Sequence, residues 1–130
     1  MRRFSLFLVA LLYLPVAAAQ QVAEPSPIGY TTIEEAFNAL KADPAVGMQE
    51  YEGWTIFNQK GDGKYILWSF TPDDHPAHPS VIRREIVKKD DQILIKMDAL
   101  CNSNQLDCDL LIDQFKKINE RISQDWAKGS

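Results

Sequence analysis

Residues 53–70 have the sequence Gly-Trp-Thr-Ile-Phe-Asn-Gln-Lys-Gly-Asp-Gly-Lys-Tyr-Ile-Leu-Trp-Ser-Phe. The two-residue hydrophobic period of 53–58 predicts a strand, and 61–63 supplies glycines for the positive φ angles of a hairpin turn. Residues 64–70 follow as a second strand. Because this second strand is apolar on nearly both faces, we expect it at the centre of a sheet.

Two more strands are predicted beyond this hairpin. Residues 81–87 and 92–97 carry the β-branched and apolar residues of strands, and the charged residues 88–91 between them predict a turn. Together the four strands predict an antiparallel meander.

Helices are predicted on both sides of the strands. Thr32-Ile-Glu-Glu35 is a capping box, apolar residues follow at helical spacing, and Asp43-Pro44 ends the helix. Residues 106–126 keep a second apolar stripe in helical register. The order helix, four strands, helix predicts an α+β domain in which both helices, including the long C-terminal one, pack on one sheet face.

The first residues have the pattern of a cleaved secretory signal. Residues 1–19 combine Arg2 and Arg3 with an apolar run and end in Ala17-Ala18-Ala19, whose small side chains suit signal peptidase. The apolar run is shorter than the roughly 20 residues that cross a bilayer, so we expect no membrane span after cleavage. Residues 20–30 are expected to be a flexible lead-in and 31–127 a single domain.

The charge balance is acidic. The chain has 14 Lys and Arg against 18 Asp and Glu, a formal net charge of −4. Loss of Arg2 and Arg3 with the signal would leave 12 against 18, near −6. This balance argues against nucleic acid or an anionic lipid surface as partner, because both bind best to clustered positive charge. The oligomeric state is not fixed by the sequence.

Both cysteines, Cys101 and Cys108, lie in the predicted domain. In an exported chain they predict a disulfide, which would stabilise the fold by roughly 2 to 3 kcal/mol through the entropy of the unfolded chain. The alternative is a redox-active or metal-binding pair. The six intervening residues disfavour it, because such pairs are usually closer together.

The loop 71–80, Thr-Pro-Asp-Asp-His-Pro-Ala-His-Pro-Ser, holds both histidines of the chain beside two carboxylates. Four of its side chains are candidate ligands for a divalent metal or a small polar molecule: Asp73, Asp74, His75 and His78. Pro76 and Pro79 exclude a helix, so the spacing does not show that the imidazoles converge. The alternative is a proline-stiffened connection whose histidines are exposed or cap backbone groups.

Three aromatic residues form a second candidate site. Trp54, Tyr65 and Trp68 lie on adjacent predicted strands, and they would form a binding patch where the sheet face is uncovered. The alternative is that they are core residues or cross-strand neighbours.

No pattern in the chain predicts catalysis. There is no Gly-x-Ser-x-Gly elbow, a disulfide would consume the cysteine nucleophiles, and adjacent acidic residues are ordinary on helices and turns. We therefore expect a protein that is not an enzyme and uses no cofactor or metal. A hydrolase centred on the histidine loop is a third hypothesis, which needs converging side chains there.

Several short motifs resemble a family of small exported proteins of pseudomonads and related gammaproteobacteria. They include Leu67-Trp-Ser-Phe-Thr-Pro72, His75-Pro-Ala-His-Pro79 and the Cys-x6-Cys pair before the final helix. The family has no assigned activity, and some members carry a DnaJ chaperone label. That label does not fit this chain, because a J domain needs His-Pro-Asp between two helices and Ala77 stands at the third position here.

These observations favour a non-enzymatic binding or interaction module of the periplasm or the secreted fraction. Its partner would be another protein or a cell-envelope component, contacted through the 71–80 loop or an uncovered sheet face. The alternative is divalent-metal or small-ligand binding at the loop between Asp73 and His78.

Export is directly testable. We expect the protein recovered from an exporting host to begin at Gln20, because Ala17 to Ala19 form the cleavage region. Intact-mass spectrometry reads both this start and the loss of two hydrogens on disulfide formation. An intact Met1, or two free thiols, would show that export is wrong.

Overall fold

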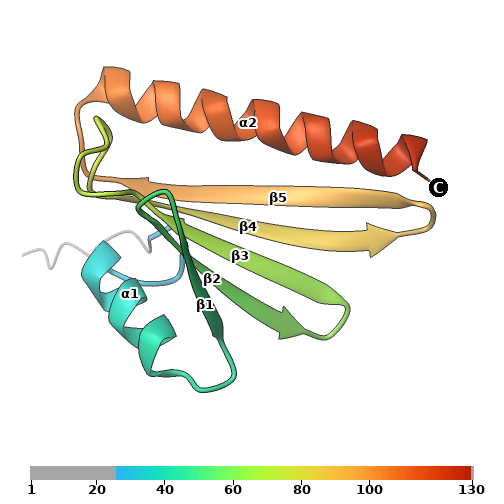
Figure 1. Cartoon of the computed structure of the whole chain (residues 1–130), viewed down its shortest axis with the longest axis horizontal. Coiled ribbons are helices and arrows are strands. Elements are labelled where there is room, and N and C mark those ends of the chain that lie inside the picture. The colour runs from blue at the N-terminus through green and yellow to red at the C-terminus, as the bar shows by residue number, and fades with distance from the viewer. Residues whose placement is uncertain (1–25, 130) are drawn as a thin grey trace, which may run out of the picture.

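The computed structural model describes residues 26–129 and contains two helices and five strands. In chain order they are α1 (Ile33–Ala42), β1 (Gly47–Tyr51), β2 (Trp54–Gly61), β3 (Lys64–Phe70), β4 (Ser80–Lys89), β5 (Gln92–Cys101) and α2 (Gln105–Lys128). The predicted α+β class is confirmed (Figure 1).

The strands form one antiparallel meander in the order β1-β2-β3-β4-β5, with β3 at its centre as predicted. The expected number of four strands is wrong, because β1 pairs with β2 through a two-residue turn at Glu52 and Gly53. Both turn residues have positive φ, the geometry of a type I′ hairpin. Most of β1 is exposed, and its sequence Gly-Met-Gln-Glu-Tyr carries no hydrophobic alternation that would reveal it.

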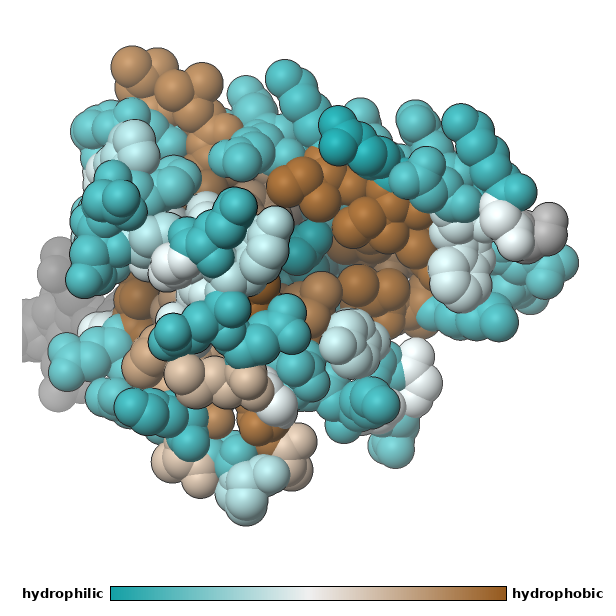
Figure 2. All heavy atoms as spheres, in the orientation of Figure 1, coloured by the Kyte–Doolittle hydropathy of each residue, from teal (hydrophilic) through white to brown (hydrophobic). Residues whose placement is uncertain are grey.

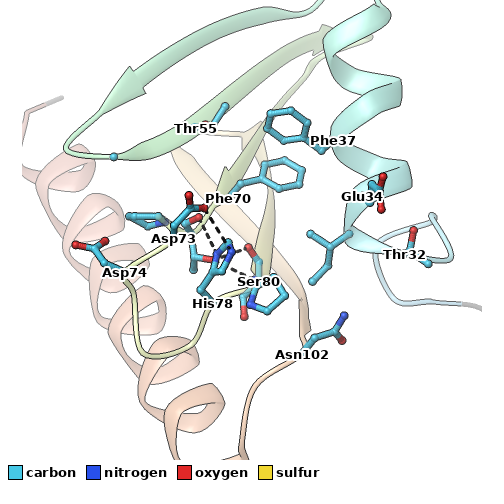
Figure 3. A pocket seen from close by; sticks show the side chains of 15 residues that line it. Thr32, Glu34, Phe37, Thr55, Phe70, Asp73, Asp74, His78, Ser80 and Asn102 are labelled. Carbon is cyan, nitrogen blue, oxygen red and sulfur yellow. Dashed lines mark hydrogen bonds and ion pairs between the residues drawn. The ribbon is translucent and has the colours of Figure 1, made fainter.

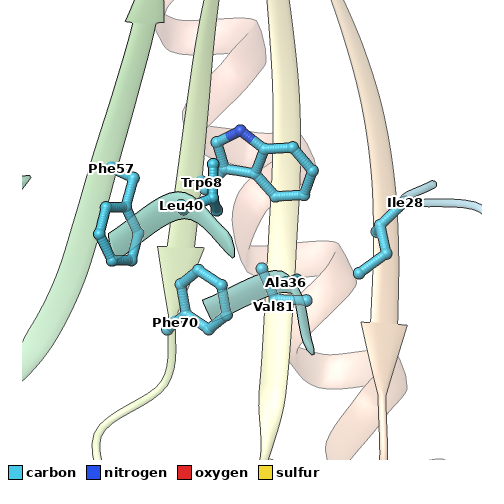
Figure 4. Close-up of a cluster of buried hydrophobic side chains, with 7 residues drawn as sticks. All are labelled: Ile28, Ala36, Leu40, Phe57, Trp68, Phe70 and Val81. Atoms are coloured by element: carbon cyan, nitrogen blue, oxygen red, sulfur yellow. The ribbon is translucent and has the colours of Figure 1, made fainter. Parts of the chain in front are cut away.

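The two helices cover opposite faces of the sheet, so the expectation that they share one face is wrong. The α1 face carries Phe57, Phe70 and Val81, whereas the α2 face carries Trp54 and Ile82. Successive strand residues point to opposite faces, so Val81 and Ile82 serve different layers. The sheet is therefore the middle layer of three, as Figure 4 shows with α1 in front of the strands and α2 behind them.

The α1 layer contains the larger of the two cores. Its helix begins as predicted, with the Thr32 hydroxyl accepting a hydrogen bond from Glu35 N at 3.1 Å. The buried residues come from α1, the three central strands and the segment before the helix: Ile28, Ala36, Leu40, Phe57, Trp68, Phe70 and Val81 (Figure 4). Burial of these side chains stabilises the fold by about 25 cal/mol for each Å² of apolar surface removed from water.

Residues 26–30 belong to the folded domain, so the predicted flexible lead-in is wrong for this part. Ile28 is only 3% exposed and Tyr30 packs edge-on against Trp68, with ring centroids 5.7 Å apart. The predicted signal peptide and residues 20–25 lie outside the described residues.

The α2 layer is held by packing and by a covalent bond. Ile82 and Ala77 meet Leu111 and Phe115 of the helix in a second buried cluster. Cys101 at the end of β5 is bonded to Cys108 in the first turn of α2, as predicted. Between residues 26 and 129, neither helix is long and apolar enough to cross a membrane.

The disulfide is expected to stabilise the domain by roughly 2 to 3 kcal/mol. Dithiothreitol should lower the free energy of unfolding of the wild-type protein by that amount, measured by urea denaturation. The double variant Cys101→Ala/Cys108→Ala is the control, because its stability should not respond to the reductant. Equal stability of oxidised and reduced wild-type protein would contradict this expectation.

A second prediction concerns Glu85, which lies on the α1 face of β4. Lys64 Nζ is 3.1 Å from its carboxylate, and this hydrogen bond lowers the pKa of Glu85 against an opposing effect of burial. A lowered pKa means that the stabilisation is present at neutral pH and is lost as the pH falls through the folded-state pKa. Stability should therefore fall less steeply with acidification in Lys64→Gln than in wild type. The control variant Lys89→Gln changes a lysine in the β4–β5 hairpin, and its stability should depend on pH as that of the wild-type protein does.

Candidate functional site

The loop 71–80 begins and ends on a clamp that continues the β3–β4 ladder. Thr71 N donates to Ser80 O at 3.1 Å, and Ser80 N donates to the Thr71 hydroxyl at 3.0 Å. The same hydroxyl donates to Ser80 O at 3.3 Å. Both residues are buried, so the two ends of the loop are fixed at the edge of the core.

The middle of the loop is anchored to the α2 layer. Ala77 is fully buried against Leu111 and Phe115, and the Ser103 hydroxyl donates to Pro76 O at 3.0 Å. Asn102 N donates to Pro79 O at 2.9 Å. The loop is therefore built into the fold, and its side chains point in directions set by the two layers.

His75 fits the structural alternative for the loop. Its Nδ1 accepts a hydrogen bond from Ala77 N at 3.0 Å, and its ring packs edge-on against Trp54 at 5.3 Å between centroids. Trp54 in turn contacts Phe115 of α2. His75 thus caps a backbone amide and closes one end of the α2 layer.

His78 is held differently. Its Nδ1 lies 2.9 Å from the Thr71 hydroxyl and 3.2 Å from Thr71 O. A carbonyl oxygen only accepts, so this network assigns the proton to Nδ1 and leaves the lone pair of a neutral imidazole on Nε2. Nε2 lies 3.6 Å from Asp73 Oδ1. The neutral His78 ring therefore offers a lone pair beside the carboxylate of Asp73, whose side chain is fully exposed.

These two atoms border a cleft with a volume of about 860 Å³ (Figure 3). The cleft lies between the start of α1 and the 71–80 loop. Its volume falls within the roughly 300–1,000 Å³ typical of ligand sites. Asp73, Asp74 and His78 line it from the loop side, and Thr32 and Glu34 line it from α1.

The cleft also has an aromatic wall. Phe37 of α1 and Phe70 of β3 line it, and their rings meet edge to face at 5.2 Å. Phe57 packs against both from below, at 5.4 and 5.6 Å. Because three rings lock one another, this wall is rigid and suited to pack against methylene groups.

The charge of the cleft is one-sided. Three carboxylates line it, those of Glu34, Asp73 and Asp74, and within residues 26–129 no Lys or Arg does. At the start of α1, Glu35 N donates to the Thr32 hydroxyl and Thr31 N donates to the Glu35 carboxylate, so these two amides are not free to bind an anion. The cleft therefore favours a cation or a strong hydrogen-bond donor.

The metal hypothesis receives no geometric support. His75 and His78 engage different partners, and one ring nitrogen of each is already hydrogen-bonded within the loop. Across residues 26–129 no three His, Cys, Asp or Glu side chains converge as a metal site. Of the four predicted loop residues, the structure brings Asp73, Asp74 and His78 to the cleft and leaves His75 outside it.

The predicted aromatic patch is wrong as a single site. Trp68 is 3% exposed in the α1 core, whereas Trp54 and Tyr65 are half-buried on the opposite face of the sheet. Trp54 and Tyr65 also lie at different ends of that face, beside His75 and in a separate groove respectively. The interpretation of Trp68 as a core residue is confirmed.

Sequence reasoning missed the half of the cleft that comes from other segments. Ile33, Glu34 and Phe37 were visible only as parts of an amphipathic helix, and Asn102 carried no signal. Gly53 also lines the cleft, where a Cβ would lie 3.1 Å from Pro72 Cβ. Its positive φ belongs to the β1–β2 turn, which the sequence did not reveal.

A scan against protein-family models, a search of the curated proteins and a search of the solved structures found no match for this chain.

Proposed function

We propose that this protein is an exported, non-enzymatic interaction module that binds a basic side chain of a partner polypeptide in the cleft between α1 and the 71–80 loop. The observation that carries the proposal is the pair of acceptors His78 Nε2 and Asp73 Oδ1, 3.6 Å apart at the cleft. One ammonium or guanidinium group, with several N–H donors, can bond to both atoms.

The rest of the cleft matches such a side chain. Lysine and arginine have an apolar stem and a charged end, and the stem would pack against Phe37 and Phe70. Glu34 and Asp74 add negative charge around the charged end. The acidic balance of the whole chain also accelerates the encounter with a basic partner.

Hydrolysis is the less supported use of the same residues. Among residues 26–129, the only hydroxyl bonded to His78 is that of Thr71, which is buried and already bonded to both backbone groups of Ser80. Ser80 donates its hydroxyl to Ala77 O rather than to an imidazole. A nucleophile needs a free hydroxyl facing the substrate, and neither residue supplies one.

The compartment we propose is the periplasm or the medium. A disulfide-bonded pair fits an oxidising environment. The predicted signal of residues 1–19 supports the same address, where a surface with a charged cleft meets partner proteins directly.

Calorimetry with penta-lysine and with its neutral counterpart, penta-acetyllysine, tests the proposal. We expect heat of binding with penta-lysine only, because acetylation removes the charge. Asp73→Asn should weaken penta-lysine binding about threefold, since it removes the charge of an exposed carboxylate beside His78, and solvent screens such charges strongly. Asp91→Asn is the matched control, because it removes the same charge from the β4–β5 turn outside the cleft.

Three results would count against this function. Equal binding of the acetylated peptide, or equal effects of Asp73→Asn and Asp91→Asn, would show that the cleft does not recognise a cation. Tighter binding of spermidine than of penta-lysine would replace the polypeptide partner by a small polyamine.

A further inference from the structure

The α2 layer leaves part of its sheet face uncovered. α2 contacts β5, and a groove of about 520 Å³ opens between its C-terminal half and the β2–β3 hairpin. Figure 2 shows hydrophobic atoms gathered between the band of α2 and the strands beneath it, framed by hydrophilic atoms. This groove lies on the opposite sheet face from the cleft at His78.

Both walls of the groove are apolar. Tyr65 and Ile86 are paired across β3 and β4 and form the sheet wall. Ile122 and Trp126 are one helical turn apart and form the helix wall. Trp126 is 43% exposed, a large apolar area left in contact with water.

The charge at this groove is opposite to that of the cleft. Lys60, Lys64 and Lys88 line it, and among the described residues no Asp or Glu does. The Lys64 amine is bonded to Glu85 on the α1 face of the sheet, so it does not face the groove, whereas Lys60 and Lys88 form no ion pair within 26–129. In a chain with an acidic balance, two unpaired cations beside one apolar groove indicate an anionic ligand.

A third cation, Arg84, lies on the same strand face two residues before Ile86 and is 8% exposed. Its guanidinium donates to Asn119 Oδ1 at 3.4 Å and lies 5.0 Å from the centroid of the Phe115 ring. Its Nε has no hydrogen-bond partner, and no carboxylate of residues 26–129 lies within 4 Å of its guanidinium. Burial lowers the pKa of Arg84, yet a guanidinium remains charged in proteins. Apolar surroundings screen this charge poorly, so it adds to the positive potential of the groove.

We propose that this groove binds a monomeric long-chain carboxylate, such as a free fatty acid. The alkyl chain lies between the sheet wall and the helix wall, and the carboxylate is held by Lys60 and Lys88. A concave site of this volume encloses single ligands. A membrane surface would instead require a broad basic face, which the acidic chain lacks.

Calorimetry with laurate, below its micelle concentration, tests this proposal on the purified protein. Dodecanol and dodecyltrimethylammonium have the same alkyl chain with neutral and positive ends. We expect laurate to bind at least about tenfold more tightly than either, because only laurate pairs with the lysines. Equal binding of laurate and dodecanol would overturn the role of charge.

Paired variants locate the site. Lys60→Glu/Lys88→Glu should weaken laurate binding about tenfold, because like charges then face the carboxylate. Lys116→Glu/Lys117→Glu makes the same charge change at two exposed lysines of α2 outside the groove and should leave the affinity unchanged. Equal effects of the two double variants would overturn the site.

Two further measurements separate the apolar wall and the membrane. Trp126→Ala should weaken laurate binding more than Leu110→Ala, which removes an exposed side chain elsewhere on α2. Binding to phosphatidylglycerol vesicles without binding of laurate would replace the proposal by a membrane surface site.

Discussion

The structure depends on how the end of β3 is joined to the beginning of β4. Phe70 pairs with Val81 in the last rung of their ladder, and the Thr71–Ser80 hydrogen bonds close it one residue further. Phe70 and Val81 belong to the α1 core, and the loop that follows carries Ala77 into the α2 core. This one closure therefore joins both layers and fixes the position of His78.

The same closure explains why the two histidines of one loop behave differently. The clamp residue Thr71 offers its hydroxyl and carbonyl to His78 Nδ1, which holds the other ring nitrogen beside Asp73 at the cleft. Ala77 is drawn to the opposite layer, and its amide is bonded to His75. Position relative to the sheet, more than residue type, gives each imidazole its partner.

A sheet covered on both faces by single helices has room for two recognition sites. The short α1 covers only part of its face and leaves an acidic cleft with an aromatic wall. The long α2 follows β5 and leaves an apolar groove with a basic rim on the other face. The two sites have opposite charge and lie on opposite faces, so they suit different ligands.

The sequence by itself determined the local elements. The Thr32 cap, the apolar β3, the paired cysteines and the periodicity of α2 are patterns within short windows, and the structure has them where they were predicted. The exposed strand β1 carried no such pattern, and its turn depends on positive φ at Glu52, which a sequence seldom reveals. Only the tertiary structure decided which face of the sheet each helix covers. Because α1 covers the face next to the loop, Glu34 and Phe37 share a cleft with His78. For the same reason, Trp54 and Trp68 lie on opposite sides of the sheet. The physical reason is that residue alternation says which side chains share a strand face, whereas the choice of the helix for that face depends on packing between distant segments.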